Sequence, residues 1–375
     1  MKKNFLVTIC MCFAFYCKGQ ELKLTFSPTI TSSQDTSVKT IAHLWENYLN
    51  ARYDDYLNLR KNAQYNRQTD SIQNLYWHSQ SEDLFIGIIE TYVPFSEFST
   101  FSIRKYADAI YEIHTFVQVK TSEEIDRSFV YKVCATKTDN GFKLLNYFDV
   151  SKNALQNYTS ENIEFYYPSG FDFDTEKVND TEKFISQFRK DYNIKKINEK
   201  IICVNCNNIN ECNTFIGFDF TTATSANWCL AHSLAPKTIL TSCQDAYIHE
   251  FVHILLQSSY PNINDILHEG IASFYGGMVG GTDYIFHAGN LQKYLSKNTI
   301  DFLDTSLLWN LRIENATLAY TVGALIINYT LNTYGIQKVI ELFSCNDYID
   351  IFSKLEIPME NVNDFFIRLL NEKFE

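Results

Sequence analysis

Apolar residues recur at helical spacing in the first long segment of the chain. Over residues 33–60, side chains such as Val38, Ile41, Leu44 and Tyr48 stand three or four positions apart. This period of about 3.6 residues places them on one face of a helix. The pattern predicts one or two amphipathic helices in this segment.

The period then changes to one typical of strands. Three runs are rich in aromatic and β-branched residues, and the last two are joined by the turn sequence TDNG: 111–120, 129–137 and 141–148. Helices followed by an antiparallel meander predict a small α+β domain over residues 21–150. Its shape resembles the nuclear-transport-factor-2-like (NTF2-like) and cystatin-like domains.

The second half of the chain begins with alternating short elements and becomes mostly helical. We expect strands at 163–167 and 201–204, a helix at 174–192, and loops with an edge strand up to residue 233. Further helices are predicted at 246–257, 264–275, 291–296, 316–334, 338–343 and 360–374. The predicted fold class is α+β, with a domain over residues 155–375 that combines a small mixed sheet with a mostly helical part.

The first twenty residues have the pattern of a secretory signal peptide. Lys2 and Lys3 precede an apolar run from residue 5 to residue 17, and a polar stretch follows. Thirteen helical residues reach only about 20 Å, which is too short to span a membrane. We therefore expect export to the periplasm, the cell surface or the medium. Lipid attachment at Cys17 is less favoured, because bulky Phe15 and Tyr16 precede it.

Composition excludes several classes of protein. The 375 residues are 46% hydrophobic, which excludes a disordered chain, and 32 basic residues stand against 44 acidic ones, for a net charge of −12. Nucleic acid is thus not expected as a partner. Among the 10 cysteines, Cys203, Cys206 and Cys212 lack a second pair at zinc-finger spacing. A loop disulfide or buried thiols is the favoured interpretation of these three.

The segment HEFVH carries the clearest chemistry. On a helix, His249 and His253 lie one turn apart on one face and can bind one metal ion, for which zinc is suited. Glu250 lies about 100° round the helix from His249, where it can act on water without being a ligand. The residues between and around them are apolar, as in a buried helix.

A catalytic zinc site needs a third protein ligand. Glu269 lies in the segment HEGIASF, on a predicted helix whose small residues Ala272 and Ser273 share its face. His268 is the rival ligand, but neighbours on a helix point about 100° apart, and we favour Glu269. His232 and His287 are isolated, and we interpret them as surface or core residues.

HEFVH followed by HEGIASF resembles the gluzincin zinc metallopeptidases, and above all the peptidase MA-like family. The resemblance covers roughly residues 162–334 and implies a zincin-like fold, with Zn²⁺ held by His249, His253 and Glu269 and with Glu250 as general base. The segment YTVG resembles the Tyr-x-x-Gly element of related gluzincins, which implies that Tyr320 hydrogen-bonds the oxyanion during catalysis.

The resulting hypothesis is an exported zinc-dependent peptidase whose substrate is a peptide or protein. One alternative is a non-catalytic surface or periplasmic binding protein built on a zincin scaffold. Another is a zinc hydrolase that acts on an amide outside peptides. No membrane span is expected after removal of the signal, and the oligomeric state is left open by the sequence.

Overall fold

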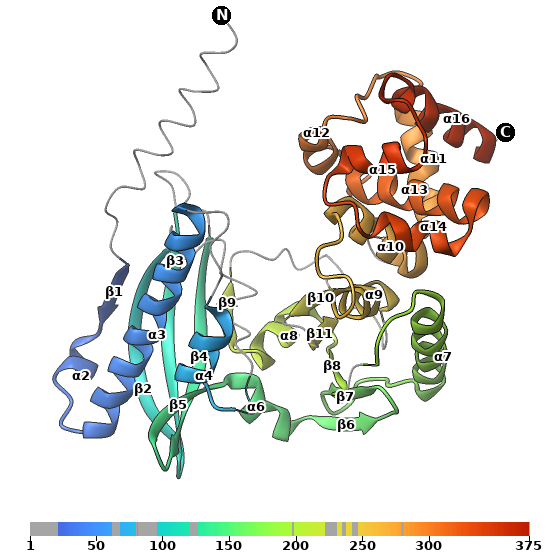
Figure 1. Ribbon diagram of the computed structural model, residues 1–375. Coiled ribbons are helices and arrows are strands. Elements are labelled where there is room, and N and C mark those ends of the chain that lie inside the picture. The colour runs from blue at the N-terminus through green and yellow to red at the C-terminus, as the bar shows by residue number, and fades with distance from the viewer. Residues whose placement is uncertain are drawn as a thin grey trace, which may run out of the picture. The chain divides into compact units, whose positions relative to one another are not determined.

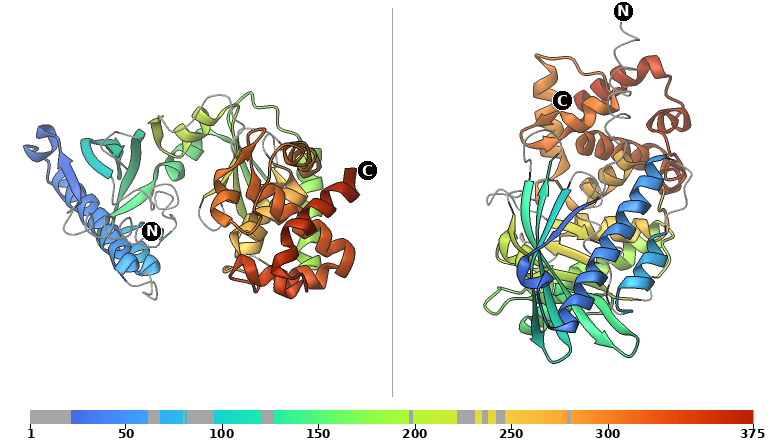
Figure 2. Two further views of the ribbon diagram at one scale, coloured as in Figure 1. Left: turned by 90° about the horizontal axis from the view of Figure 1, so that it is seen from above. Right: turned by 90° about the vertical axis from the view of Figure 1, so that its left-hand side faces the viewer.

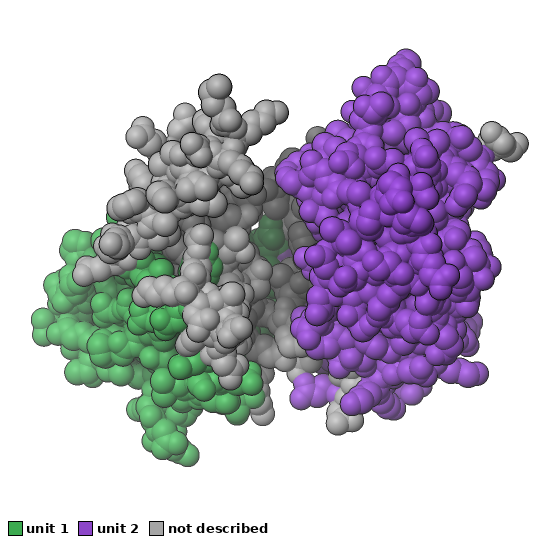
Figure 3. All heavy atoms as spheres, turned by 45° about the horizontal axis from the view of Figure 1, so that its top comes forward, with its two compact units in different colours: residues 1–153, 213–225 green, residues 154–212, 226–375 purple. Residues whose placement is uncertain are grey.

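The chain forms two compact units in a computed structural model, coloured green and purple in Figure 3. The structure describes residues 22–61, 68–79, 81, 96–120, 127–196, 199–221, 231–234, 238–241, 247–278 and 281–374. Unit 1 comprises residues 1–153 and 213–225, and unit 2 comprises residues 154–212 and 226–375. The predicted signal peptide, residues 1–20, lies outside the described residues.

Unit 1 is a curved sheet with helices against it (Figure 1). The strands run in the order β1-β2-β3-β4-β5, and β9 pairs with β4. The elements are β1 (Lys23–Phe26), α2 (Pro28–Thr31), α3 (Thr36–Lys61), α4 (Thr69–Tyr76), β2 (Ser96–Ala107), β3 (Ile110–Val119), β4 (Arg127–Thr138), β5 (Gly141–Asn146), α6 (Tyr147–Ser151) and β9 (Phe218–Thr221). The predicted meander is present, and the amphipathic segment is the single long helix α3.

Helix α3 lies along one face of this sheet, as Figure 2 also shows. Ile41, Trp45 and Tyr48 are fully buried on the side of the helix that faces the strands. The indole Nε1 of Trp45 donates a hydrogen bond of 3.1 Å to Thr115 Oγ1 on β3. Burial of large aromatic side chains contributes most of the stability of such a layer. Helix and sheet therefore share one core.

Unit 2 begins with a five-stranded mixed sheet in the order β10-β11-β8-β7-β6. The strands are β6 (Gln156–Thr159), β7 (Ile163–Tyr167), β8 (Ile201–Asn205), β10 (Ala231–Leu234) and β11 (Thr238–Thr241). The central strands β7, β8 and β11 are parallel, and the outer strands β6 and β10 are antiparallel to their neighbours. Helix α7 (Thr175–Asp191) connects β7 to β8, and the Asp174 carboxylate caps its first turn.

The rest of unit 2 is mostly helical, as predicted. It begins with α8 (Ile209–Phe215), whose last three residues are counted in unit 1. The other elements are α9 (Ile248–Gln257), α10 (Asp265–Gly276), α11 (Tyr284–Leu295), α12 (Thr305–Asn310), a ribbon of β12 (Arg312–Ile313) and β13 (Ala316–Thr317), α13 (Leu318–Tyr334), α14 (Ile336–Leu342), α15 (Tyr348–Lys354) and α16 (Val362–Phe374). One core cluster joins β7, β8, α7 and most of these helices. Among the described residues, no helix has the length and apolar character needed to cross a membrane.

Helix α11 begins seven residues earlier than the sequence predicts. The expected helix at 291–296 is the end of α11, which starts at Tyr284. The Asp283 side chain accepts a hydrogen bond of 2.9 Å from the Ile285 backbone and caps this start. Two exposed apolar residues in the first turn, Ile285 and Phe286, break the amphipathic pattern that a sequence reading depends on.

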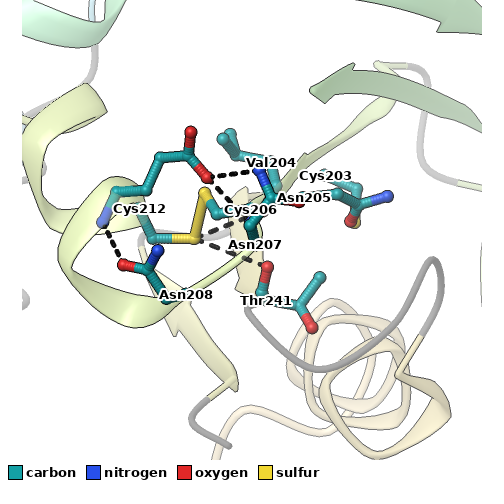
Figure 4. Close-up of a disulfide and its surroundings, with 9 residues drawn as sticks. Cys203, Val204, Asn205, Cys206, Asn207, Asn208, Cys212 and Thr241 are labelled. Atoms are coloured by element: carbon teal, nitrogen blue, oxygen red, sulfur yellow. Dashed lines mark hydrogen bonds between the residues drawn. A yellow bond between two sulfur atoms is a disulfide. The ribbon is translucent and has the colours of Figure 1, made fainter. Parts of the chain in front are cut away.

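A disulfide closes the turn between β8 and α8 (Figure 4). It joins Cys206 to Cys212, and Cys203 is a buried free thiol. The favoured interpretation of these three cysteines, a loop disulfide or buried thiols, is therefore confirmed, and both are present. The backbone amide of Cys206 also donates to the carbonyl of Thr241 at 2.9 Å, which ties the turn to β11.

Candidate metal centre

Helix α9 presents two histidines from a buried position. His249 and His253 lie one turn apart, and their ring centroids are 4.8 Å apart. Their exposed fractions are only 5% and 8%. Phe251, Val252 and Leu255 fill the other faces of the helix and belong to the core of unit 2. The apolar flanks of the motif thus bury the helix, and the two imidazoles lie on one side of it.

Helix α10 supplies the third side chain of the group. The Glu269 Oε2 atom lies 3.3 Å from His249 Nε2 and 3.4 Å from His253 Nε2. Helix α10 approaches closely because Gly276 has no side chain. A Cβ there would lie 2.1 Å from the backbone nitrogen of His249. The three side chains form the one His/Cys/Asp/Glu group among the described residues that could hold a metal ion.

The distances from Glu269 Oε2 to the two imidazole nitrogens fit a tetrahedral ion. Two ligands about 2.0 to 2.1 Å from an ion, at the tetrahedral angle, stand about 3.3 to 3.4 Å apart. The two distances from Glu269 Oε2 have these values. This oxygen is buried and has no hydrogen bond of normal geometry. A buried carboxylate oxygen without a well-formed hydrogen bond is costly, and a cation between the three atoms would satisfy it.

The electrostatics of the group favour an ionised carboxylate. Burial alone raises the pKa of Glu269, but the hydrogen-bonding contacts and charges of His249 and His253 outweigh it and hold that pKa well below its usual range. Burial also lowers the pKa of His249, while Glu269 and Glu250 raise it more. The carboxylate is therefore in the form that ligates metals.

Each imidazole has an acceptor at its other nitrogen. His249 Nδ1 lies 2.9 Å from the carbonyl oxygen of Gly277 and donates to it. His253 Nδ1 lies 3.3 Å from Nε2 of His268. Both Nε2 atoms are thus directed towards Glu269. His268, the rival third ligand, lies on the far side of the His253 ring and contacts no Nε2 atom of the group.

Glu250 lies in the first turn of α9, with an exposed fraction of 7%. Its negative charge, like that of Glu269, contributes to the raised pKa of both Tyr247 and Tyr320, after burial as the first cause. Both carboxylates therefore act electrostatically on the same two phenols. The helix N-terminus also favours a negative charge at this position.

Tyr320, on α13, lies beside His249 of α9. Its ring centroid is 6.1 Å from that of His249, and the two rings are inclined by 29°. Helix α13 comes this close because Gly323, one turn further on, packs directly on Gly270 of α10. A Cβ on Gly323 would lie 2.1 Å from the carbonyl oxygen of Ile266 and 2.7 Å from the Cα of Gly270. Gly270 and Gly323 therefore set the distance between α10, which carries Glu269, and α13, which carries Tyr320.

Two aromatic residues near the group were missed by the sequence analysis. Tyr247 stacks on His249 at 5.5 Å and 15°, and its hydroxyl donates to the carbonyl of Met278 at 2.7 Å. Trp309 meets the Tyr320 ring edge-on at 6.1 Å and lines an open cavity of about 520 Å³ together with Asp265. Tyr247 adjoins the motif and could have been suspected. No motif or spacing in the sequence indicates that Trp309 lies near Tyr320.

The isolated histidines are not part of the group. His287 is buried on α11, and its Nε2 lies 2.6 Å from Thr282 Oγ1. It is a hydrogen-bonded core residue, as expected. His232 lies on β10, and its side chain is outside the described atoms.

Comparisons with protein-family models, with curated proteins and with solved structures find no match to this chain.

Proposed function

We propose that the chain is an exported zinc-dependent peptidase of the gluzincin type, related to the peptidase MA-like family. The observation that carries the proposal is the convergence of His249, His253 and Glu269, with a buried carboxylate oxygen that makes no hydrogen bond of normal geometry. Two imidazoles and one carboxylate are the ligand set of catalytic zinc in many hydrolases, and they leave a fourth position open. The resemblance of HEFVH and HEGIASF to gluzincins supports the same ion.

Zinc held there would lower the pKa of water and polarise a substrate carbonyl. Glu250, buried beside the group, takes the proton of the attacking water and passes it to the leaving amine. The Tyr320 hydroxyl donates a hydrogen bond to the oxygen of the carbonyl as negative charge develops on it.

A peptide substrate is supported by the strand next to α9. Strand β10 is the outer strand of the sheet, pairs with β11 on one side, and contacts α9. Among the described residues nothing pairs with its other edge. Such an edge can hold an extended peptide through backbone hydrogen bonds, which a small non-peptide amide could not exploit.

Export is proposed from the first twenty residues and agrees with the disulfide between Cys206 and Cys212, because disulfides persist in oxidising compartments. The NTF2-like or cystatin-like resemblance of unit 1 fits its helix-on-sheet arrangement. We propose no chemistry for that unit.

The replacement Glu250→Gln tests the mechanism. Gln has the same shape but cannot accept the proton, so we expect zinc content to stay at one per chain while peptide cleavage falls by a factor of about 10² to 10⁴. Zinc is measured by elemental analysis and cleavage with a peptide library. Glu360→Gln, at an exposed position of unit 2, is the matched control. Cleavage by Glu250→Gln at the wild-type rate would show that another residue is the base.

A further inference from the structure

Helix α10 contacts both nitrogens of each imidazole in the group. The Nε2 atoms of His249 and His253 face Glu269 at 3.3 and 3.4 Å. Their Nδ1 atoms face Gly277, just beyond the end of the helix, and His268, the neighbour of Glu269. One helix thus fixes the orientation of both rings of another helix.

The two Nδ1 contacts differ in their chemistry. A neutral imidazole that offers Nε2 as a ligand carries its proton on Nδ1, and that N–H needs an acceptor. A backbone carbonyl, as at Gly277, accepts in every state. A histidine accepts only through an unprotonated nitrogen, here Nε2 of His268, at 3.3 Å from His253 Nδ1.

His268 cannot serve as a ligand in this arrangement. Its Nε2 is directed at the Nδ1 side of the His253 ring, whereas the ion site lies on the Nε2 side. The two rings meet edge to face, with centroids 4.4 Å apart. The His268 ring therefore occupies the space on the Nδ1 side of the His253 ring.

We propose that His268 is a positioning residue for the metal centre: its Nε2 accepts the Nδ1 proton of His253 and so holds the Nε2 of His253 ready for the ion. This inference rests on the proposed zinc site and goes beyond the three ligands. Hydrogen-bonding partners of ligating histidines commonly change metal affinity by a factor of 10 to 100 when removed.

Two replacements of similar size separate positioning from packing. In His268→Gln the amide oxygen can reach the place of the imidazole Nε2 and accept the same proton, whereas His268→Leu fills the space without an acceptor. We expect the zinc dissociation constant to rise about 10- to 100-fold in His268→Leu and to stay within about threefold of wild type in His268→Gln. Competition with a fluorescent chelator measures this constant without any substrate.

The visible spectrum of the Co²⁺-substituted protein is a second readout. We expect the bands of His268→Leu to shift, because the His253 ring is free to tilt, and those of His268→Gln to match wild type. Melting temperatures of the metal-free proteins report whether both variants fold. Equal zinc affinity in all three proteins, or equal loss in both variants, overturns the positioning role.

The outcomes for the two proposals are distinguishable. A wild-type protein that binds no zinc overturns both the zinc centre and the role of His268. A wild-type protein that binds zinc but cleaves no peptide overturns the peptidase alone, and the affinity series still decides the role of His268.

Discussion

Single residues of the candidate site could be predicted where spacing fixes direction. The interval of four between His249 and His253 brings both rings to one side of α9, and the structure has them there. The angle between helix neighbours allowed only one of His268 and Glu269 to face the ion, and Glu269 was favoured. The structure directs the two side chains to opposite sides of His253. The role of His268 could not be predicted from the sequence, because it depends on its contact with Nδ1 of His253 on another helix.

The proposed role of Tyr320, a hydrogen bond to the oxyanion, can be tested by a single replacement. Replacement by Phe removes only the hydroxyl and keeps the ring that packs beside His249 and Trp309. We expect kcat to fall by a factor of about 10² to 10³, the usual effect of removing one oxyanion donor, with zinc affinity unchanged. Steady-state kinetics on a cleaved peptide measure the change. A rise in KM with constant kcat would instead assign Tyr320 to substrate binding.

Elements with a clear period or a clear stop were predicted well. The strand at 163–167 is β7, and α13 ends at Gly335, whose φ of +82° stops the helix. Strand β2 was not predicted, because its buried positions include Ser96 and Thr100 as well as apolar residues. Contacts between helices could not be predicted from the sequence either. The sequence contains the glycines of EG and YTVG, but only the structure shows that Gly270 and Gly323 touch.

This helix contact makes Gly323→Ala a sharp test of the arrangement. The new Cβ would lie 2.1 Å from the Ile266 carbonyl oxygen, so α13 must move away from α10. We expect a loss of about 1 to 3 kcal/mol in the free energy of unfolding, typical of overpacking. We also expect weaker cleavage, since Tyr320 and Glu269 move apart. Denaturant unfolding measures the first effect, and Asn332→Ala, at an exposed position of α13, is the control. Wild-type stability in Gly323→Ala would contradict the close contact.

At the scale of the whole molecule, composition and period predicted an α+β chain with a helical second part, and the structure has this character. The return of the chain to unit 1 was not anticipated. Residues 213–225 belong to unit 1, where β9 adds to β4 through Phe218 to Thr221. A four-residue strand that pairs with a segment about ninety positions away leaves no periodic trace in the sequence. Such pairing is decided by tertiary packing rather than by local preference.

The division into units leads to a prediction about zinc and stability. All three proposed ligands lie in unit 2, so an ion bound to the native state stabilises that unit directly and unit 1 only through any coupling between them. At free zinc about a thousandfold above the dissociation constant, the gain is about 4 kcal/mol. For a unit of this size we expect its melting temperature to rise by roughly 8 to 16 °C. Calorimetry of the full chain, with chelator and with zinc, should show one transition that moves and one that stays.

Hydrogen exchange on the same full chain assigns the two transitions. Zinc should slow exchange in peptides from α9 and α10, whose side chains form the group, and leave β2 to β5 unchanged. Glu269→Gln is the matched control, because it keeps the size of the side chain but loses the ligand charge, and zinc should then shift neither transition. If both transitions rise together with zinc in the wild type, the two units unfold as one cooperative body and the stabilisation is not confined to unit 2. If neither rises, the three side chains do not form a zinc site in solution.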